Sequence, residues 1–332
     1  MHTNLISFYK NKNVLVTGGA GFIGSNLTMA LVDLGAHVAI VDCFMPEFGA
    51  NEFNYSKISS QIKIHHEDIR NQEAMKKIVK DQEIIFHLAG LNDHVAALKN
   101  PFPDLEVNII GTTHLLEAIK HHDQESICVY GGTRAEYGPT TKLPVNEENP
   151  TKPKGVYEIS ALTAQQIFLF YGRTSKIKPI CLRLTNLYGP RSQMKHNRTG
   201  VANWLIRELL VRKKVPIMGE GKILRDFLFV LDAVQAMLLC PLHPKTYHEI
   251  LNVGNPSPTS FLQYAQSLIN VAGFGEIEFI PMSNERKQQE PGDYYSDISK
   301  INQLTNWKPH TSLNEGLQTT LSFYQSHRVH YL

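Results

Sequence analysis

The amino-acid sequence predicts an α/β protein with a Rossmann-type, doubly wound parallel sheet and a smaller C-terminal α/β substrate lobe. Strand-like and helix-like segments alternate as far as residue 185, which is the order typical of such a sheet. The glycine-rich segment Thr17–Gly24 lies between a predicted strand and a predicted helix. Asp42 ends the next predicted strand, where Rossmann sheets carry an acidic residue.

Hydrophobic patterning and turn residues set the expected elements. The sequence predicts strands at residues 13–17, 37–41, 62–65, 83–88, 126–130 and 178–184. It predicts helices at residues 22–35, 71–80, 104–121 and 157–174. After Asn186, glycine and proline separate shorter elements. We therefore expect a Rossmann domain over residues 1–185, with a returning segment near 226–253, and mainly a substrate-binding lobe over 186–332.

Composition and charge argue against several classes of protein. The 332 residues carry a formal net charge of +2, so we expect no nucleic-acid partner. No apolar run reaches transmembrane length and no signal peptide is visible, so we expect a cytoplasmic protein without a membrane partner. The four cysteines are isolated, and the histidines are interpreted as solvated or capping residues, so we expect no metal site.

The segment Thr17–Gly24 reads TGGAGFIG and predicts a cradle for a diphosphate. Gly18 permits a tight turn, Gly21 lets the backbone approach a pyrophosphate, and Gly24 allows close packing of helix and strand. The helix that begins at Phe22 would direct free N–H groups and a partial positive charge at the anion. A dinucleotide is the ligand that this context favours.

Asp42 indicates which dinucleotide is bound. Its carboxylate can accept hydrogen bonds from the free ribose hydroxyls of NAD, and it would repel the 2′-phosphate of NADP. The following residues, Cys43 and Phe44, supply no arginine for that phosphate. We therefore expect NAD as the cofactor.

Further motifs give the chain a resemblance to the extended short-chain dehydrogenases, in particular to their nucleotide-sugar epimerase/dehydratase group. The resemblance implies bound NAD, a nucleoside-diphosphate sugar as substrate, and a homodimer formed through the helices at 104–121 and 157–174. The matching segments are TGGAGFIG at 17–24, DIR at 68–70, HLAG at 87–90, NxxGTxxLLEA at 108–118, LRLTNLYGPR at 182–191, GEG at 219–221, RDF at 225–227 and WxP at 307–309.

The same resemblance implies two sets of binding residues. The expected cofactor-binding residues are Gly18, Gly21, Phe22, Ile23, Gly24, Asp42, Asp68, Ile69, Leu88, Ala89, Gly90, Asn108 and Tyr157. The expected substrate-binding residues are Asn186, Arg191, Ile217, Arg225, Arg286 and Asp293. Of these, Arg286 departs from the family pattern: the family often has an arginine just before 292–293, where this chain has Glu290-Pro291, and Arg286 and Lys287 could reach the same phosphate. Arginine is suited to the diphosphate because its guanidinium can bind phosphate through two hydrogen bonds.

The resemblance also implies the catalytic residues. The family uses a tyrosine as base, a lysine four residues later, and a serine or threonine that bonds the same substrate oxygen. Tyr157 and Thr133 match the first and the third, but Ala161 stands in place of the lysine. Because a nearby cation favours the phenolate form of a tyrosine, we hypothesise that Arg134 faces the site and partly replaces the lysine. Other candidate cations are Lys152 and Lys154.

The residues after Thr133 bear on the type of reaction. The family's dehydratases have an Asp-Glu pair there, whereas this chain has Arg134 and Ala135, so elimination of water lacks its proton carrier. Glu136 comes one place late, where a side chain usually faces the opposite way. An epimerase needs less, because it removes a hydride from a sugar hydroxyl carbon and returns it to the opposite face. The sequence therefore favours an NAD-dependent nucleotide-sugar epimerase acting at C4 or another hydroxyl carbon.

Other functions stay open at this point. Within enzymes, the alternatives are a reductase, dehydrogenase, decarboxylase or dehydratase of a nucleotide sugar. Outside enzymes, the alternative is a family member that binds the cofactor but has weakened or lost catalysis, because Ala161 replaces the lysine. The sequence leaves the sugar and the nucleotide base undetermined.

Overall fold

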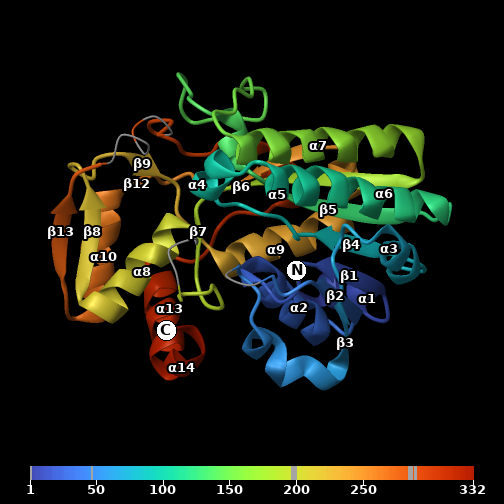
Figure 1. Cartoon of the computed structure of the whole chain (residues 1–332), viewed down its shortest axis with the longest axis horizontal. Coiled ribbons are helices and arrows are strands. Elements are labelled where there is room, and N and C mark those ends of the chain that lie inside the picture. The colour runs from blue at the N-terminus through green and yellow to red at the C-terminus, as the bar shows by residue number, and fades with distance from the viewer. Residues whose placement is uncertain (1, 46–47, 196–199, 283–286, 288–289) are drawn as a thin grey trace.

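The computed structural model describes residues 2–45, 48–195, 200–282, 287 and 290–332. The described residues form a central parallel sheet in the order β11-β6-β5-β4-β1-β2-β3, which confirms the predicted doubly wound fold (Figure 1). The strands are β1 (Asn13–Thr17), β2 (His37–Asp42), β3 (Ile62–His66), β4 (Ile84–His87), β5 (Ser126–Thr133), β6 (Ile177–Leu184) and β11 (Ile250–Val253).

Helices cover both faces of the sheet, and alternating side chains on β1 serve both cores. Val14 and Val16 belong to the core beneath α1 (His2–Tyr9), α2 (Phe22–Asp33) and α9 (Val230–Leu239), whereas Leu15 belongs to the core on the other face. The helices of that second face are α3 (Gln72–Ile78), α6 (Thr112–His121) and α7 (Val156–Thr174). Figure 1 shows α6 and α7 side by side along this face.

The helix predicted at 104–121 differs from the expected regular α-helix. It consists of α5 (Phe102–Asp104), the π-helical segment η2 (Leu105–Gly111) and α6. Within η2, the Asn108 amide bonds the backbone of Leu91 at both its N–H and its carbonyl, and the Thr112 hydroxyl donates to the Asn108 carbonyl. These side-chain bonds accompany a widened helical turn, and a simple 3.6-residue pattern does not reveal such a turn.

The chain after β6 builds a second core beside the sheet. Its two longer strands, β8 (Lys214–Met218) and β13 (Glu276–Ile280), pair in parallel, and Tyr188, Tyr264 and Tyr324 are fully or almost fully buried among the surrounding helices. The helices of this second core are α8 (Val201–Arg212), α10 (Phe261–Ala272), α13 (Leu313–Ser326) and α14 (Arg328–Tyr331), whereas α12 (Ser299–Thr305) packs against β11 and belongs to the core of the central sheet. Because β11 joins the central sheet from this half of the sequence, the chain crosses between the two parts more than once.

Shorter elements connect these parts. They are α4 (His94–Lys99), β7 (Leu187–Tyr188), β9 (Leu224–Arg225), β10 (Leu228–Phe229), β12 (Thr259–Ser260), η1 (Glu52–Gln61), η3 (Arg134–Tyr137), η4 (Cys240–Leu242) and η5 (Pro244–Thr246). Among the described residues, no helix has the length and apolar character needed to cross a membrane.

Candidate active site

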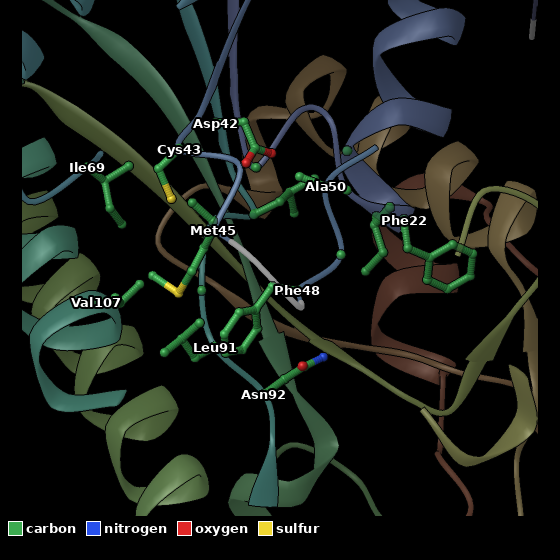
Figure 2. A pocket seen from close by; sticks show the side chains of 18 of the residues that line it. Phe22, Asp42, Cys43, Met45, Phe48, Ala50, Ile69, Leu91, Asn92 and Val107 are labelled. Atoms are coloured by element: carbon green, nitrogen blue, oxygen red, sulfur yellow. The ribbon is translucent and has the colours of Figure 1, made fainter. Parts of the chain in front are cut away.

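A cleft of about 230 Å³ lies beyond the carboxyl ends of β1, β2 and β4 (Figure 2). Parallel sheets of this kind bind ligands at this edge. The expected cofactor-binding residues that line it are Gly18, Gly21, Phe22, Ile23, Gly24, Asp42, Asp68, Ile69, Leu88, Ala89 and Gly90. The structure therefore brings together residues from four separate predicted segments.

The glycine turn has the geometry of a diphosphate cradle. Gly18 adopts a φ of +70°, which L side chains rarely adopt, and a Cβ on Gly24 would lie 2.1 Å from the carbonyl oxygen of Gly18. Gly21 caps α2 with no side-chain hydrogen bond, so the first N–H groups of that helix stay available to an anion. Glycine at these positions keeps the turn tight and open, and the cleft fits the pyrophosphate of NAD.

Asp42 is fixed at the edge of the cleft. Its two carboxylate oxygens accept hydrogen bonds from the backbone N–H groups of Ala20 and Phe44, each at 3.1 Å. Burial raises the pKa of the Asp42 carboxyl, and these backbone donors work in the opposite direction. Met45 and Leu91 lie on the wall of the same cleft (Figure 2). A carboxylate beside apolar walls suits the ribose and adenine of a dinucleotide.

A larger cleft of about 570 Å³ adjoins the first one, and Asn92 and Gly200 line both. Its walls come from the ends of β5 and β6, the start of α7, and the second lobe. The predicted residues that line this larger cleft are Thr133, Arg134, Tyr157, Asn186, Ile217 and Arg225. The candidate catalytic residues therefore stand in the same cavity as part of the candidate substrate-binding set.

Arg191 and Asp293 line neither cleft, in contrast to the substrate contacts expected from the sequence. The Arg191 guanidinium donates to Asn26 Oδ1 at 2.8 Å and lies over the Phe323 ring, so it ties α2 to α13. Asp293 Oδ1 accepts a hydrogen bond from the Leu224 N–H. Each residue therefore links two parts of the protein through one hydrogen bond of its side chain.

Two further predicted residues stand apart from the clefts. Asn108 does not line the cofactor cleft, but its side chain bonds the backbone of Leu91, which does. It also donates to Ser160 Oγ on α7. Arg286 lies outside the described residues.

Tyr157 lies in the first turn of α7 and faces the larger cleft. Burial raises its pKa to about 12, and the carboxylates of Glu158 and Glu136 add to this effect. The Thr133 side chain and the charge of Arg134 act in the opposite direction. In this environment the phenol keeps its proton at neutral pH. Tyr157 can therefore act as a base only if another group favours the loss of that proton.

A buried ion pair fixes the end of β5. Thr133 caps η3, and Glu136 Oε1 accepts a hydrogen bond from the Thr133 N–H. Glu136 Oε2 pairs with Arg183 Nε at 3.0 Å, and both side chains are buried. Glu136 is thereby directed away from the cleft, so the structure gives it no position from which to eliminate water.

Arg134 lines the larger cleft, where its guanidinium lies over the ring of Tyr294 with 4.9 Å to the ring centroid. Its charge lowers the pKa of Tyr157. Of the two lysines considered as alternative cations, Lys154 lines the cleft and Lys152 does not. The geometry is therefore compatible with the hypothesis that Arg134 acts electrostatically near Tyr157.

His94 is a cleft residue that the sequence analysis missed. Its Nδ1 lies 2.8 Å from Glu158 Oε1, and its ring meets the Tyr157 ring edge-on, with 4.9 Å between centroids. The sequence feature that could have identified His94 as a cleft residue is its position just after the segment HLAG at 87–90. The interpretation of the histidines as solvated or capping is wrong for His87, which is buried between the hydroxyls of Thr17 and Thr112.

Arg225 lines the cleft but already has partners. Its guanidinium pairs with Glu290 and donates to the carbonyls of Leu224 and Gly292. Burial lowers its pKa to about 10, and the nearby Arg134 charge contributes to this effect. A substrate phosphate that binds Arg225 must therefore compete with the Glu290 carboxylate.

Asn186 has an unsatisfied group at the same cleft. Its Oδ1 is buried and has no hydrogen-bond partner among the described residues. Buried polar atoms usually have a partner, so this amide is available to a bound ligand. Among the described residues, no group of three or more His, Cys, Asp or Glu side chains could hold a metal ion.

Comparison with known proteins agrees with this geometry. A putative UDP-glucose 4-epimerase of Methanocaldococcus jannaschii is 30% identical over 94% of this chain and 98% of its own. The UDP-glucose 4-epimerase of Thermotoga maritima, solved with UDP-glucose, is 28% identical over 95% of this chain and 99% of its own, with a TM-score of 0.86. UDP-glucuronic acid 4-epimerase of Bacillus cereus, solved with UDP-glucuronic acid and NAD, is 27% identical over the same shares, with a TM-score of 0.84.

The family model also covers most of the chain. Residues 14–254 match the NAD dependent epimerase/dehydratase family, and this span includes the glycine turn, Asp42, Thr133 and Tyr157. Relatives named as decarboxylases and dehydratases of nucleotide sugars match at similar identity. The cleft at the sheet edge, the matched span and the relatives agree, and the chain belongs to the NAD-dependent epimerase/dehydratase family of enzymes.

Proposed function

We propose that this protein is an NAD-dependent epimerase of a nucleoside-diphosphate sugar, acting at C4. The observation that carries the proposal is the junction of the two clefts, since the cofactor cleft opens into a larger cavity that holds Tyr157 and Thr133. The relatives act on UDP-sugars according to their names, so UDP-sugars are the first substrates to test.

The chain's own residues have defined tasks in this reaction. NAD, when bound, would reversibly accept the hydride of the sugar carbon. Tyr157 Oη takes the proton of the sugar hydroxyl, and the Thr133 hydroxyl holds the same oxygen in place. After the oxidised sugar has turned, Tyr157 returns the proton. The large cleft supports this proposal, because a sugar must rotate within it while its nucleotide stays bound.

We assign binding of the nucleotide part of the substrate mainly to residues of the C-terminal part of the chain, 186–332. Asn186 and Arg225 would bind the diphosphate, and Ile217 would lie against the nucleotide base. The Nδ2–H groups of Asn186 would donate to a phosphate oxygen. Arg225 offers a planar cation when Glu290 is displaced. Asn186 follows β6 of the central sheet, whereas Ile217 and Arg225 come from β8 and β9, so this set joins the sheet to the later part of the chain.

Dehydration is disfavoured by the surroundings of Thr133. Arg134 and Ala135 supply no carboxylate, and Glu136 is buried against Arg183. Decarboxylation is the second candidate function, because UDP-glucuronic acid decarboxylases are among the relatives and Arg134 offers the cleft a cation. A cationic side chain near the sugar end suits a substrate with a carboxylate.

The test combines cofactor analysis with a substrate screen. Purified protein should release NAD on denaturation, and it should convert UDP-glucose, UDP-N-acetylglucosamine or UDP-glucuronic acid to the C4 epimer without added cofactor. Tyr157→Phe should keep NAD and lose activity by at least about 100-fold. Release of CO₂ from UDP-glucuronic acid would favour the decarboxylase. Absence of both NAD and conversion would contradict the proposal.

We also propose that the protein forms a homodimer through α5–η2–α6 and α7. This helical face carries large apolar side chains that are exposed in the single chain, as expected for an interface. They are Phe102, Ile110, Ile159 and Phe170.

A further inference from the structure

We propose that His94, held by Glu158, takes the place of the missing lysine by accepting a proton from Tyr157 during the reaction. This inference rests on the proposed function, since it concerns how Tyr157 becomes a base. Three side chains from two helices carry it, because His94 begins α4 and Tyr157 and Glu158 lie in the first turn of α7. All three line the larger cleft.

The contacts of His94 orient its ring. Nδ1 lies 2.8 Å from Glu158 Oε1, and Nε2 has no hydrogen-bond partner among the described residues. The ring stands edge-on to the Tyr157 ring with 4.9 Å between centroids, so the two rings are in contact. The proposed transfer requires Nε2 to reach Tyr157 Oη directly or through one bridging water. A carboxylate on one imidazole nitrogen and a hydroxyl group near the ring is the arrangement by which hydrolases use histidine as a proton acceptor.

Carboxyl groups surround the His94 ring. Burial alone would raise the pKa of Glu158, but the hydrogen bond and charge of His94 lower it, so Glu158 is an anion. Asp93 caps α4 beside His94, and Asp104 is buried nearby with one oxygen lacking a partner. The pKa of Asp104 is raised to about 6, mainly by burial and also by the charges of Asp93 and Glu158, while His94 acts in the opposite direction. An imidazolium at His94 therefore forms among carboxylates.

The proton balance closes without another reactant. As the sugar hydroxyl loses its proton to Tyr157 Oη, the phenol proton of Tyr157 passes to His94 Nε2, and an imidazolium forms beside Glu158. In the second half of the reaction both protons return. The negative charge of Glu158 raises the pKa of Tyr157, and the imidazolium neutralises that charge when the tyrosine gives up its proton. His94 thus acts through Tyr157.

The other charged groups of the cleft are placed differently. Arg134 lowers the pKa of Tyr157 but lies over Tyr294, and it remains charged throughout the reaction. Lys99, at the end of α4, also lines the cleft, as does Lys154. Of the titratable groups near Tyr157, His94 combines ring contact with a carboxylate partner on the far nitrogen.

The first test measures kinetics across pH. His94→Gln should lower kcat about 100-fold and leave KM within about threefold, because the change affects proton transfer rather than binding. His310→Gln, at an exposed position, serves as the matched control. The pH profile of kcat for the native enzyme should have an acid limb that belongs to the group accepting the Tyr157 proton. This acid limb should vanish in His94→Gln and persist in Asp104→Asn.

The second test is rescue. Ala161→Lys introduces the family's lysine, and it should raise the rate of the His94→Gln enzyme at least about tenfold while changing the native rate little. An unchanged kcat in His94→Gln, or no rescue by lysine, would overturn the inference. If the native enzyme converts no nucleotide sugar, the proposed function fails, and the kinetic tests do not apply.

A third readout needs no turnover. In NMR spectra of the NAD-loaded native protein, the ring signal of His94 is identified by its loss in His94→Gln. Because Nδ1 contacts Glu158 Oε1, the chemical shift of this ring signal should change in Glu158→Gln. An unmoved signal in Glu158→Gln would overturn the inference even if the enzyme is an active epimerase.

Discussion

At the scale of single residues, the proposed phosphate-binding role of Arg225 depends on a competing charge. Its guanidinium is almost fully buried, stacks over Phe261, and pairs with Glu290. The pairing satisfies a cation that would be costly to bury alone. A diphosphate offers the same guanidinium two negatively charged groups, so binding of the nucleotide would replace Glu290.

Replacement of Glu290 tests this competition. Glu290→Gln removes the negative charge but keeps the shape, so Arg225 should bind the substrate diphosphate more readily. We expect KM for the nucleotide sugar to fall about fivefold with kcat little changed, as measured by steady-state kinetics. Glu220→Gln, at an exposed pair with Lys222, is the control. A higher KM in Glu290→Gln would mean that the carboxylate itself contacts the substrate.

At the scale of elements, the turn between β1 and α2 depends on close backbone packing. The Gly18 carbonyl oxygen lies so near Gly24 that no side chain fits between turn and helix. The same turn leaves the start of α2 without a side-chain cap, which keeps its N–H groups available for an anion. A change at Gly24 must therefore displace backbone rather than a flexible side chain.

Gly24→Ala tests the role of this turn. The added Cβ would meet backbone at 2.1 Å, so the start of α2 must shift away from the cradle. We expect the affinity for NAD to fall at least about 100-fold, because a displacement of this size breaks several pyrophosphate contacts at once. The measurement is the NAD content of purified protein together with calorimetric titration. Circular dichroism checks that the variant is folded, and full retention of NAD in a folded variant would contradict the expectation.

At the scale of the whole molecule, the site needs both halves of the chain. The NAD cleft belongs to the sheet edge, whereas the larger cleft needs residues such as Ile217 and Arg225 from the second lobe. The apolar face of α5–η2–α6 and α7 lies on the outer side of the sheet domain (Figure 1). A dimer through this face would bury α7, whose first turn carries Tyr157.

A charge on this face should break the proposed dimer. Phe170 on α7 is 51% exposed in the single chain, and Phe170→Glu would bury an unpaired carboxylate in the interface. We expect the variant to be monomeric in light scattering coupled to size-exclusion chromatography. Phe279→Glu, on β13 at 60% exposure, should leave the assembly unchanged. A native protein that is already monomeric would contradict the dimer.

The features that the sequence predicted are those set by local physics. Alternation of strand and helix, the glycine turn and Asp42 each depend on residues close together in the chain, and the parallel sheet is confirmed. The π-helical segment around Asn108 was missed because it depends on bonds to Leu91, which lies on another segment. The choice of Thr133 and Tyr157 as candidate catalytic residues followed from the family resemblance, because their spacing in the sequence does not by itself indicate that they share a site.

The sequence by itself determined the Rossmann sheet, the diphosphate cradle and the preference for NAD, because short-range patterning and backbone geometry decide them. Only the tertiary structure decided which charges meet. His94 meets Glu158 across 64 positions, and Arg225 meets Glu290 across 65. Such pairs form where separate elements pack, and the local sequence pattern does not indicate which elements pack together. The absence of the lysine at Ala161 was visible in the sequence, whereas the histidine beside Tyr157 became visible only in the fold.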